Sequence, residues 1–234
     1  MAKATVAEEE YLQTIFWLEE AQLPITAANV ARAMQVSAPT VHEMVGRLEG
    51  DGYITRNADK SLEFTSKGRE FAAEVVKRHR LIERFLTDVL GIPWDEVHEE
   101  AERLEHAMSP VLEERMRAAI GDAATCPHGH PITGEREFGV QLADVEDGAS
   151  VVVLRFENEA EDLLHYLKDS GLYPGLSGTV ELSDDEVTVV ADGDSATVTR
   201  SVAETVAVRA DPSPPPRAAL ASGQLVFAKE RYGK

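Results

Sequence analysis

Residues 98–108, HEEAERLEHAM, place histidines and glutamates at helical spacing. His98, Glu102, Glu105 and His106 fall at i, i+4, i+7 and i+8, so they share one face of a helix. Glutamates at these offsets repel one another unless water or a cation lies among them. A divalent cation bound by carboxylate oxygen and imidazole nitrogen is one interpretation. An exposed acidic face is the alternative, and this segment alone does not decide between them.

Length and composition limit the classes of protein that remain. The chain has 234 residues, of which 43% are hydrophobic and 28% charged, which is ordinary for a globular protein and excludes wholesale disorder. The sequence has no apolar run long enough to span a membrane, and its start lacks the apolar core of a signal peptide. The single cysteine, Cys126, excludes an internal disulfide framework and fits a reducing compartment. We expect a cytoplasmic protein with no membrane partner.

The net charge of −19 is distributed unevenly along the chain. Residues 29–80 hold nine Lys and Arg against seven Asp and Glu, whereas residues 81–234 hold 13 against 30. A DNA duplex could therefore approach the early part of an otherwise acidic chain. The surplus acid later in the chain could serve solubility or cation binding.

The first 90 residues have the layout of a winged helix-turn-helix domain. Apolar spacing and helix caps predict three helices, then two short strands around a turn, then a long helix. The respective ranges are 6–21, 27–35 and 38–52 for the helices, 53–56 and 61–65 for the strands, and 66–90 for the long helix.

The third helix is the expected recognition helix. Val41, Val45 and Leu48 form its apolar side, so its polar residues face outward, where the amino-terminal part of such a helix meets base edges. Hydroxyl and basic groups suit phosphate contacts. The candidate DNA-binding residues are Ser37, Pro39, Thr40, His42, Glu43, Arg47, Arg56 and Lys60. A winged helix that binds only other proteins is the alternative.

The rest of the chain predicts two further helices, over 94–107 and 109–120, and then a β-rich region. Paired helices would suit a homodimer, because a two-fold duplex site needs a two-fold protein. From about residue 140, short runs rich in Val and Thr predict a small barrel of roughly five strands with one helical insert in 159–175. The fold class is thus mainly α with a carboxy-terminal small β-barrel. Whether QLVFAK in the proline-rich end adds a strand is left open.

Several motifs in this order resemble the diphtheria-toxin-repressor and manganese-repressor family of metal-dependent transcriptional regulators. The resemblance covers roughly residues 5–210 and rests on EEYLQTIFWLEE, SAPTVHEMVGRLEGDGYI, RHRLIERFLTDVLGI, DEVHEEAERLEHAMS and CPHGHPI. It implies a homodimer that binds a palindromic double-stranded operator once a divalent metal has ordered the first helix. The implied domains are a winged helix-turn-helix at 1–73, a helical metal-binding and dimerisation domain at 74–139, an SH3-like (FeoA-like) domain at 140–210, and a Pro-rich segment at 211–234.

The resemblance also implies two metal sites per subunit. By motif position, the primary ligands are Glu10, Glu102, Glu105 and His106. Secondary candidates are His79, Glu83, His98, Cys126, His128 and Asp162, with Glu159 as the reserve for Asp162. A buried loop thiol beside a surface histidine is the alternative interpretation of Cys126 and His128. His130 and His165 are assigned no role.

The primary ligands favour manganese. Iron-type members carry methionine and cysteine where this chain has Glu10 and Glu102, and carboxylate with imidazole suits the harder Mn²⁺ ion. Some manganese members carry a further acid where this chain has Gln13, which puts a two-metal cluster of that kind in doubt. We therefore expect an Mn²⁺-dependent repressor of metal-homeostasis genes and no enzyme, with an Fe²⁺-dependent repressor of iron uptake as the alternative. A metalloenzyme with a Glu/His site would leave the winged helix unexplained, and a third interpretation has a purely structural metal and a barrel that binds a protein.

Overall fold

The structure is a computed structural model that describes residues 4–191 and 193–211. The chain divides between His79 and Arg80, inside helix α4 (Ser66–Leu90), into two compact units. Within the described residues, no helix is long and apolar enough to cross a membrane. The QLVFAK segment lies outside the described residues.

The amino-terminal unit opens with three helices, α1 (Val6–Glu20), α2 (Ala27–Ala33) and α3 (Ala38–Gly50). Each begins at a hydroxyl side chain, Thr5, Thr26 or Ser37, that accepts a hydrogen bond from a backbone N–H of the first turn. Such caps satisfy donors that have no partner inside the helix.

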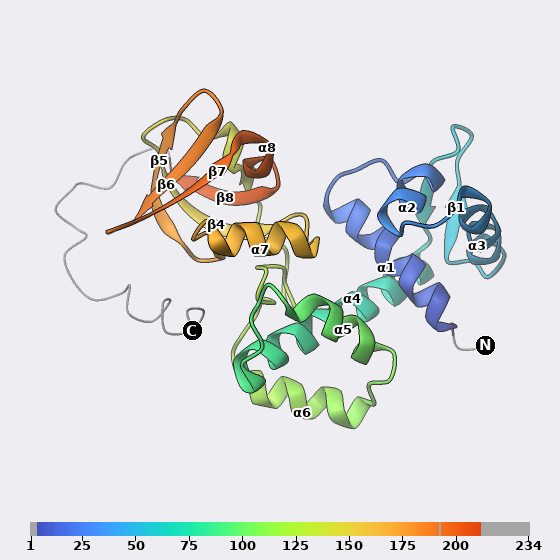
Figure 1. Cartoon of the computed structure of the whole chain (residues 1–234). Coiled ribbons are helices and arrows are strands. Elements are labelled where there is room, and N and C mark those ends of the chain that lie inside the picture. The colour runs from blue at the N-terminus through green and yellow to red at the C-terminus, as the bar shows by residue number, and fades with distance from the viewer. Residues whose placement is uncertain (1–3, 192, 212–234) are drawn as a thin grey trace. The chain divides into compact units, whose positions relative to one another are not determined.

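A two-stranded hairpin follows, formed by β1 (Ile54–Arg56) and β2 (Leu62–Phe64). The strands are antiparallel, with Ile54 opposite Phe64. The order of three helices and a hairpin confirms the winged helix-turn-helix prediction (Figure 1). The predicted inward side of α3 is also confirmed, because Val41, Val45 and Leu48 are each at most 1% exposed in the core of this unit.

The carboxy-terminal unit begins with the rest of α4, followed by α5 (Val97–Glu105) and α6 (Pro110–Ile120). Leu81 and Ile82 of α4, Ala101 of α5 and Met116 of α6 share one apolar core. Cys126, from the loop after α6, belongs to the same core. The part of the loop around Cys126 is therefore packed against the helices.

A six-stranded antiparallel sheet completes this unit, in the order β3-β8-β4-β5-β6-β7. Its strands are β3 (Val140–Gln141), β4 (Ser150–Phe156), β5 (Ser177–Leu182), β6 (Glu186–Ala191), β7 (Asp194–Thr199) and β8 (Val206–Asp211). The expected barrel is wrong: β3 and β7 are the edges, and in the described part of the chain no pairing joins them.

Helices cover the apolar face of this open sheet. Helix α7 (Glu161–Asp169) follows β4 (Figure 1), and its Leu164 and Leu167 are fully buried in the same core as Phe156. The short helices η1 (Leu142–Asp144) and α8 (Arg200–Ala203) add further buried residues to that core. Because helices bury the face that a closed sheet would bury, and β3 is only two residues long, strand closure is not needed.

Candidate metal centre

Helix α4 places two potential metal ligands one turn apart. His79 and Glu83 occur at i and i+4, so their side chains leave the same face of the helix. Both are buried: His79 is 1% exposed and Glu83 is 0% exposed. A fully buried carboxylate is costly unless hydrogen bonds or opposite charges compensate it.

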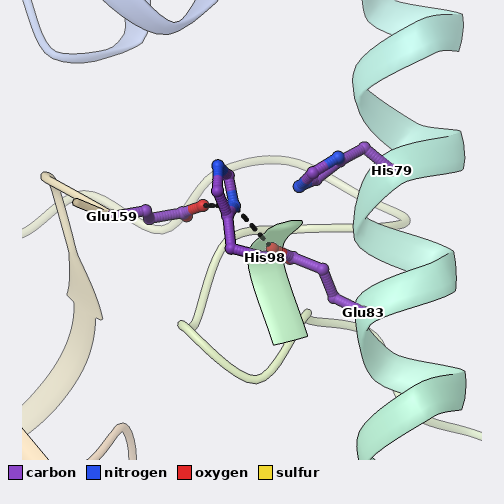
Figure 2. A group of neighbouring side chains, drawn as sticks. All are labelled: His79, Glu83, His98 and Glu159. Carbon is purple, nitrogen blue, oxygen red and sulfur yellow. Dashed lines mark hydrogen bonds and ion pairs between the residues drawn. The ribbon is translucent and has the colours of Figure 1, made fainter. Parts of the chain in front are cut away.

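Helix α5 supplies an imidazole to Glu83. His98 lies in the first turn of α5, and its Nδ1 is 3.0 Å from Oε1 of Glu83. The same nitrogen is 3.3 Å from Oε2 of Glu159, which precedes α7 in the sheet domain. Figure 2 shows His98 between these two carboxylates, with His79 beside Glu83 on the long helix. One imidazole thus connects the helical and β-rich parts of the unit.

The loop Cys126–His130 brings a second imidazole to Glu83. His128 is fully buried, and its Nδ1 lies 3.3 Å from Oε1 of Glu83 and 3.6 Å from Oε2 of Glu159. Its Nε2 lies 2.7 Å from the backbone oxygen of Trp94, so an Nε2–H donates there. This arrangement leaves Nδ1 facing the carboxylates, and the described residues offer it no hydrogen-bond partner. A metal-binding histidine is typically oriented by such a bond from its other nitrogen.

Glycine makes this loop possible. Gly129 has φ +94°, and a Cβ there would lie 2.0 Å from the backbone oxygen of Leu154 and 2.7 Å from Cα of Arg155. Only a residue without a side chain can bring the loop this close to β4. The His128 oxygen accepts a hydrogen bond from the N–H of Phe156, which holds the loop against the strand.

The protonation of this cluster follows from its buried carboxylates. Burial alone would lower the pKa of His98, but hydrogen bonds to Glu159 and Glu83 outweigh it and raise that pKa to about 10. The pKa of His128 is also raised well above its ordinary value, against the effect of burial, by the charges of Glu83 and Glu159. Burial raises the pKa of the Cys126 thiol to about 11, with Glu83 adding to the effect. These shifts favour positively charged imidazoles at His98 and His128 and a neutral thiol at Cys126.

Two overlapping sets of donors could hold a cation. The first is His79, Glu83, His98 and Glu159 (Figure 2). The second is Glu83, Cys126 and His128, and within each set the ligand atoms lie within 4.8 Å of one another. Imidazole and carboxylate suit Mn²⁺ and Fe²⁺, and the thiolate of Cys126 would favour softer ions. The donor types, their burial and the unbonded His128 Nδ1 fit a divalent metal, whose charge would replace that of the two protons.

The structure therefore brings together five of the six secondary candidates from the sequence, all except Asp162. Asp162 lies in the first turn of α7 and belongs to neither set; its reserve, Glu159, occupies that place. His130, to which the sequence assigned no role, is 5% exposed, and its Nε2 lies 3.2 Å from Oε1 of Glu159. Its position two residues after His128 in CPHGH was the only signal for it.

The primary candidates lie on α1 and at the end of α5. Glu10 is exposed on α1, in the amino-terminal unit. In the other unit, Glu105 is 1% exposed, and its Oε1 lies 3.4 Å from Nε2 of His106. Glu102 is half-exposed, and its Oε1 lies 3.5 Å from Nε2 of His98. The pairing of Glu105 with His106 agrees with a shared role, and the four-residue site stays a prediction.

The candidate DNA-binding residues are all exposed. Ser37 caps α3, and its Oγ lies 2.7 Å from Oγ1 of Thr40. In the hairpin, Arg56 pairs loosely with Glu49 at 3.6 Å, and Lys60 adopts φ +69° in the turn. Pro39, His42 and Glu43 also lie on the exposed side of α3. Arg47 is half-exposed and forms an ion pair with Glu8 of α1. Glu8 was not among the candidates from the sequence.

Each tryptophan of the chain contacts one of the candidate histidines. Trp17 and His79 form an edge-on ring pair with centroids 5.6 Å apart. Trp94 and His128 form a similar pair at 6.1 Å, and Trp94 also packs against Phe156. These contacts help to fix the orientation of both imidazoles.

A winged helix-turn-helix followed by a buried histidine–carboxylate cluster defines a DNA-binding protein that responds to metal. Models of known protein families match most of the chain and support this class. The amino-terminal DNA-binding domain of the iron-dependent repressors matches residues 3–62, and their metal-binding and dimerisation domain matches residues 65–134. The FeoA domain matches residues 140–210.

Relatives and solved structures point the same way. The iron-dependent repressor IdeR of Mycobacterium tuberculosis is 38% identical over 219 residues, which cover 86% of this chain and 95% of that protein. The crystal structure of IdeR from T. acidophilum is 28% identical with a TM-score of 0.76, covering 90% of this chain and all of that one. A manganese-dependent transcriptional repressor in complex with manganese is 29% identical with a TM-score of 0.79, covering 87% and 99%.

The chain therefore belongs to the diphtheria-toxin-repressor and manganese-repressor family of metal-dependent transcriptional repressors. The resemblance inferred from its sequence motifs is confirmed, as is the prediction that it is not an enzyme. Its domains are those of a protein that binds DNA and forms dimers.

Proposed function

We propose that this chain is a repressor activated by Mn²⁺ that controls metal-homeostasis genes by binding a palindromic operator as a homodimer. The observation that carries the choice of metal is the pair of carboxylates, Glu10 and Glu102, at positions where iron-type members carry sulfur ligands. Carboxylate and imidazole ligands suit the hard Mn²⁺ ion, whereas thioether and thiolate ligands favour softer ions. Because affinity alone would still favour Fe²⁺, coordination geometry and metal supply must complete the selection.

Two ions per subunit fit the donors. Glu10, Glu102, Glu105 and His106 would hold the first. The buried centre around Glu83 would hold the second, with His79, His98, Cys126 and His128 from the helices and the loop and Glu159 from the β-rich part. A cation at the second centre would offset the negative charges of Glu83 and Glu159. Because Glu159 precedes α7, occupancy would fasten the FeoA-like domain to α4 and α5.

Exposed apolar side chains support the homodimer. Val111 of α6 is 68% exposed, Leu112 is 45% exposed, and Leu104 at the end of α5 is 42% exposed. Exposed apolar side chains on consecutive helices of one unit are typical of an interface between subunits. A two-fold dimer would present two recognition helices to two half-sites of a palindrome.

Operator affinity across several metals tests the proposal. A duplex selected from random sequence by the Mn²⁺-loaded protein is titrated with protein holding Mn²⁺, Fe²⁺ (without oxygen), Co²⁺, Zn²⁺ or no metal. Equal affinity with and without metal would refute metal sensing, and activation by Fe²⁺ but not by Mn²⁺ would favour the iron alternative. The double variant Glu10→Met, Glu102→Cys should shift activation from Mn²⁺ toward Fe²⁺. Glu99→Cys, which places a thiol at an exposed position on the helix that carries Glu102, is the matched control and should not shift the metal preference.

A further inference from the structure

The carboxylate of Glu8 connects the first turn of α1 to the recognition helix. Its Oε2 accepts a hydrogen bond of 2.7 Å from the N–H of Thr5, which closes the capping box of α1. Its Oε1 accepts a hydrogen bond of 2.8 Å from Nη2 of Arg47 in the last turn of α3. One carboxylate thus uses one oxygen for the start of α1 and the other for the helix expected to enter the major groove.

Burial makes this ion pair more than an ordinary surface contact. The Glu8 side chain is 7% exposed and that of Arg47 is 51% exposed. The carboxylate is therefore largely withdrawn from water, while the guanidinium keeps an open side toward solvent.

The bond to Glu8 orients Arg47 without occupying it. A guanidinium has five N–H donors in a rigid plane, and the bond to Glu8 involves only Nη2. The other donors can contact a phosphate or a base edge. An arginine held in one orientation loses less side-chain entropy when it binds than an unrestrained one.

The same helical turn carries Glu10, a ligand in the proposed primary metal site. Glu8 reaches Arg47 only while the first turn of α1 is folded, because the turn positions the Glu8 backbone. Anything that holds Glu10 in helical conformation therefore also holds Glu8 in reach of Arg47. This link to metal rests on the proposed function, whereas the contact between Glu8 and Arg47 does not.

We propose that Glu8 is a positioning residue that couples the folding of the first turn of α1 to the orientation of Arg47 on the recognition helix. Metal binding at Glu10 then promotes duplex binding in part through Arg47. The coupling is reciprocal, since a duplex that engages Arg47 also stabilises the first turn of α1.

A double-mutant cycle on the full chain tests the coupling without DNA. The measured quantity is amide hydrogen exchange at Glu9 and Glu10 in the metal-free protein. Arg47→Met keeps the apolar stem of the side chain and should speed exchange about two- to five-fold, the range expected for a partly exposed ion pair. In the Glu8→Gln background the same change should have no further effect. Equal effects of Arg47→Met in both backgrounds would overturn the proposal.

A matched control separates this link from a general loss of helix stability. Glu19, at the other end of α1, pairs with Arg69 at 2.5 Å in the same unit. Glu19→Gln removes an ion pair of α1 that does not involve the recognition helix, so the first turn should keep its response to Arg47→Met. If Glu19→Gln abolished that response as Glu8→Gln does, Glu8 would have no specific role.

A second cycle measures the selected duplex with and without Mn²⁺. Glu8→Gln should reduce the Mn²⁺-induced gain in affinity about two- to five-fold, and Glu8→Gln added to Arg47→Met should reduce it no further. If the duplex affinity of the wild-type protein does not depend on Mn²⁺, the proposed function is refuted. The coupling between Glu8 and Arg47 is then tested by the hydrogen-exchange cycle alone. A wild-type protein that responds to Mn²⁺ while the two substitutions act additively would refute the coupling alone.

Discussion

Gly129→Ala should dismantle the loop that carries Cys126 and His128. An alanine at φ +94° costs roughly 1–2 kcal/mol in backbone strain. The new Cβ would also lie 2.0 Å from the Leu154 backbone oxygen, and because that atom belongs to a strand it cannot move aside cheaply. Forced repacking of this kind typically costs about 1–3 kcal/mol more. The expected loss in the free energy of unfolding is therefore about 2–5 kcal/mol, a large share of the stability of a typical domain.

Gly134→Ala provides the matched control. Gly134 lies in the same connecting region with φ +82°, but a Cβ there meets nothing within 4 Å. It should lose only the backbone term of roughly 1–2 kcal/mol. Urea unfolding gives both free energies, and titration with Co²⁺ reports the Cys126–His128 donors through the absorption of a cobalt–thiolate bond. If the two variants lost equal stability, or if Gly129→Ala kept the wild-type cobalt spectrum, the close packing of the loop on β4 would not position these ligands.

Three further predictions concern the shared carboxylate, a pH-dependent ion pair and the recognition helix. Glu83→Gln removes the one ligand common to both donor sets. Mn²⁺ affinity, measured from the paramagnetic resonance of the free ion, should fall by at least the roughly 10- to 100-fold that results from losing a hydrogen-bond partner of a ligand. The control Asp88→Asn, on the same helix, should bind Mn²⁺ normally, and equal affinities of the two variants would show that Glu83 is not a ligand. A hydrogen bond to Asp95 raises the pKa of His165, so this pair stabilises the fold fully below the ordinary histidine pKa of about 6.5 and loses that contribution as pH rises through the raised value. His165→Asn should therefore cost more in urea unfolding at about pH 6 than at about pH 9, and a cost independent of pH would contradict the charge on His165. Gly46 lies on the exposed side of α3, where a Cβ meets nothing within 4 Å; Gly46→Ala should raise the free energy of unfolding by about 0.5–1 kcal/mol, and a decrease would reveal a contact that the structure does not contain.

Helices were the most predictable part of the fold because their ends depend on local chemistry. The long helix predicted over 66–90 is observed with those bounds, because Gly91, with φ +73°, ends it and Pro93 lies two residues further on. The barrel could not be predicted in the same way. Closure depends on how long the edge strands are and on what covers the apolar face, and β3 and α8 are too short to leave a periodic pattern.

The residues of the candidate site also differ in how far the sequence predicts them. His79 and Glu83 follow from helical spacing, and Cys126 and His128 from the CPHGH motif with the family resemblance. The choice between Glu159 and Asp162 does not follow from either, because it depends on where α7 begins. The helix starts at Glu161, which leaves Glu159 in the preceding segment, close to His98 and His128. Only the packing of α7 on the sheet determines that register.

The placement of the two tryptophans gives the protein a built-in optical reporter for each side of the buried centre. Trp17 contacts His79 of one donor set, and Trp94 contacts His128 of the other. A protonated imidazole and a paramagnetic ion each quench indole emission by a different mechanism, so filling either set should change the fluorescence of its own tryptophan. With Trp17→Phe and Trp94→Phe proteins, the response of each histidine to metal binding can be followed separately, without any attached dye.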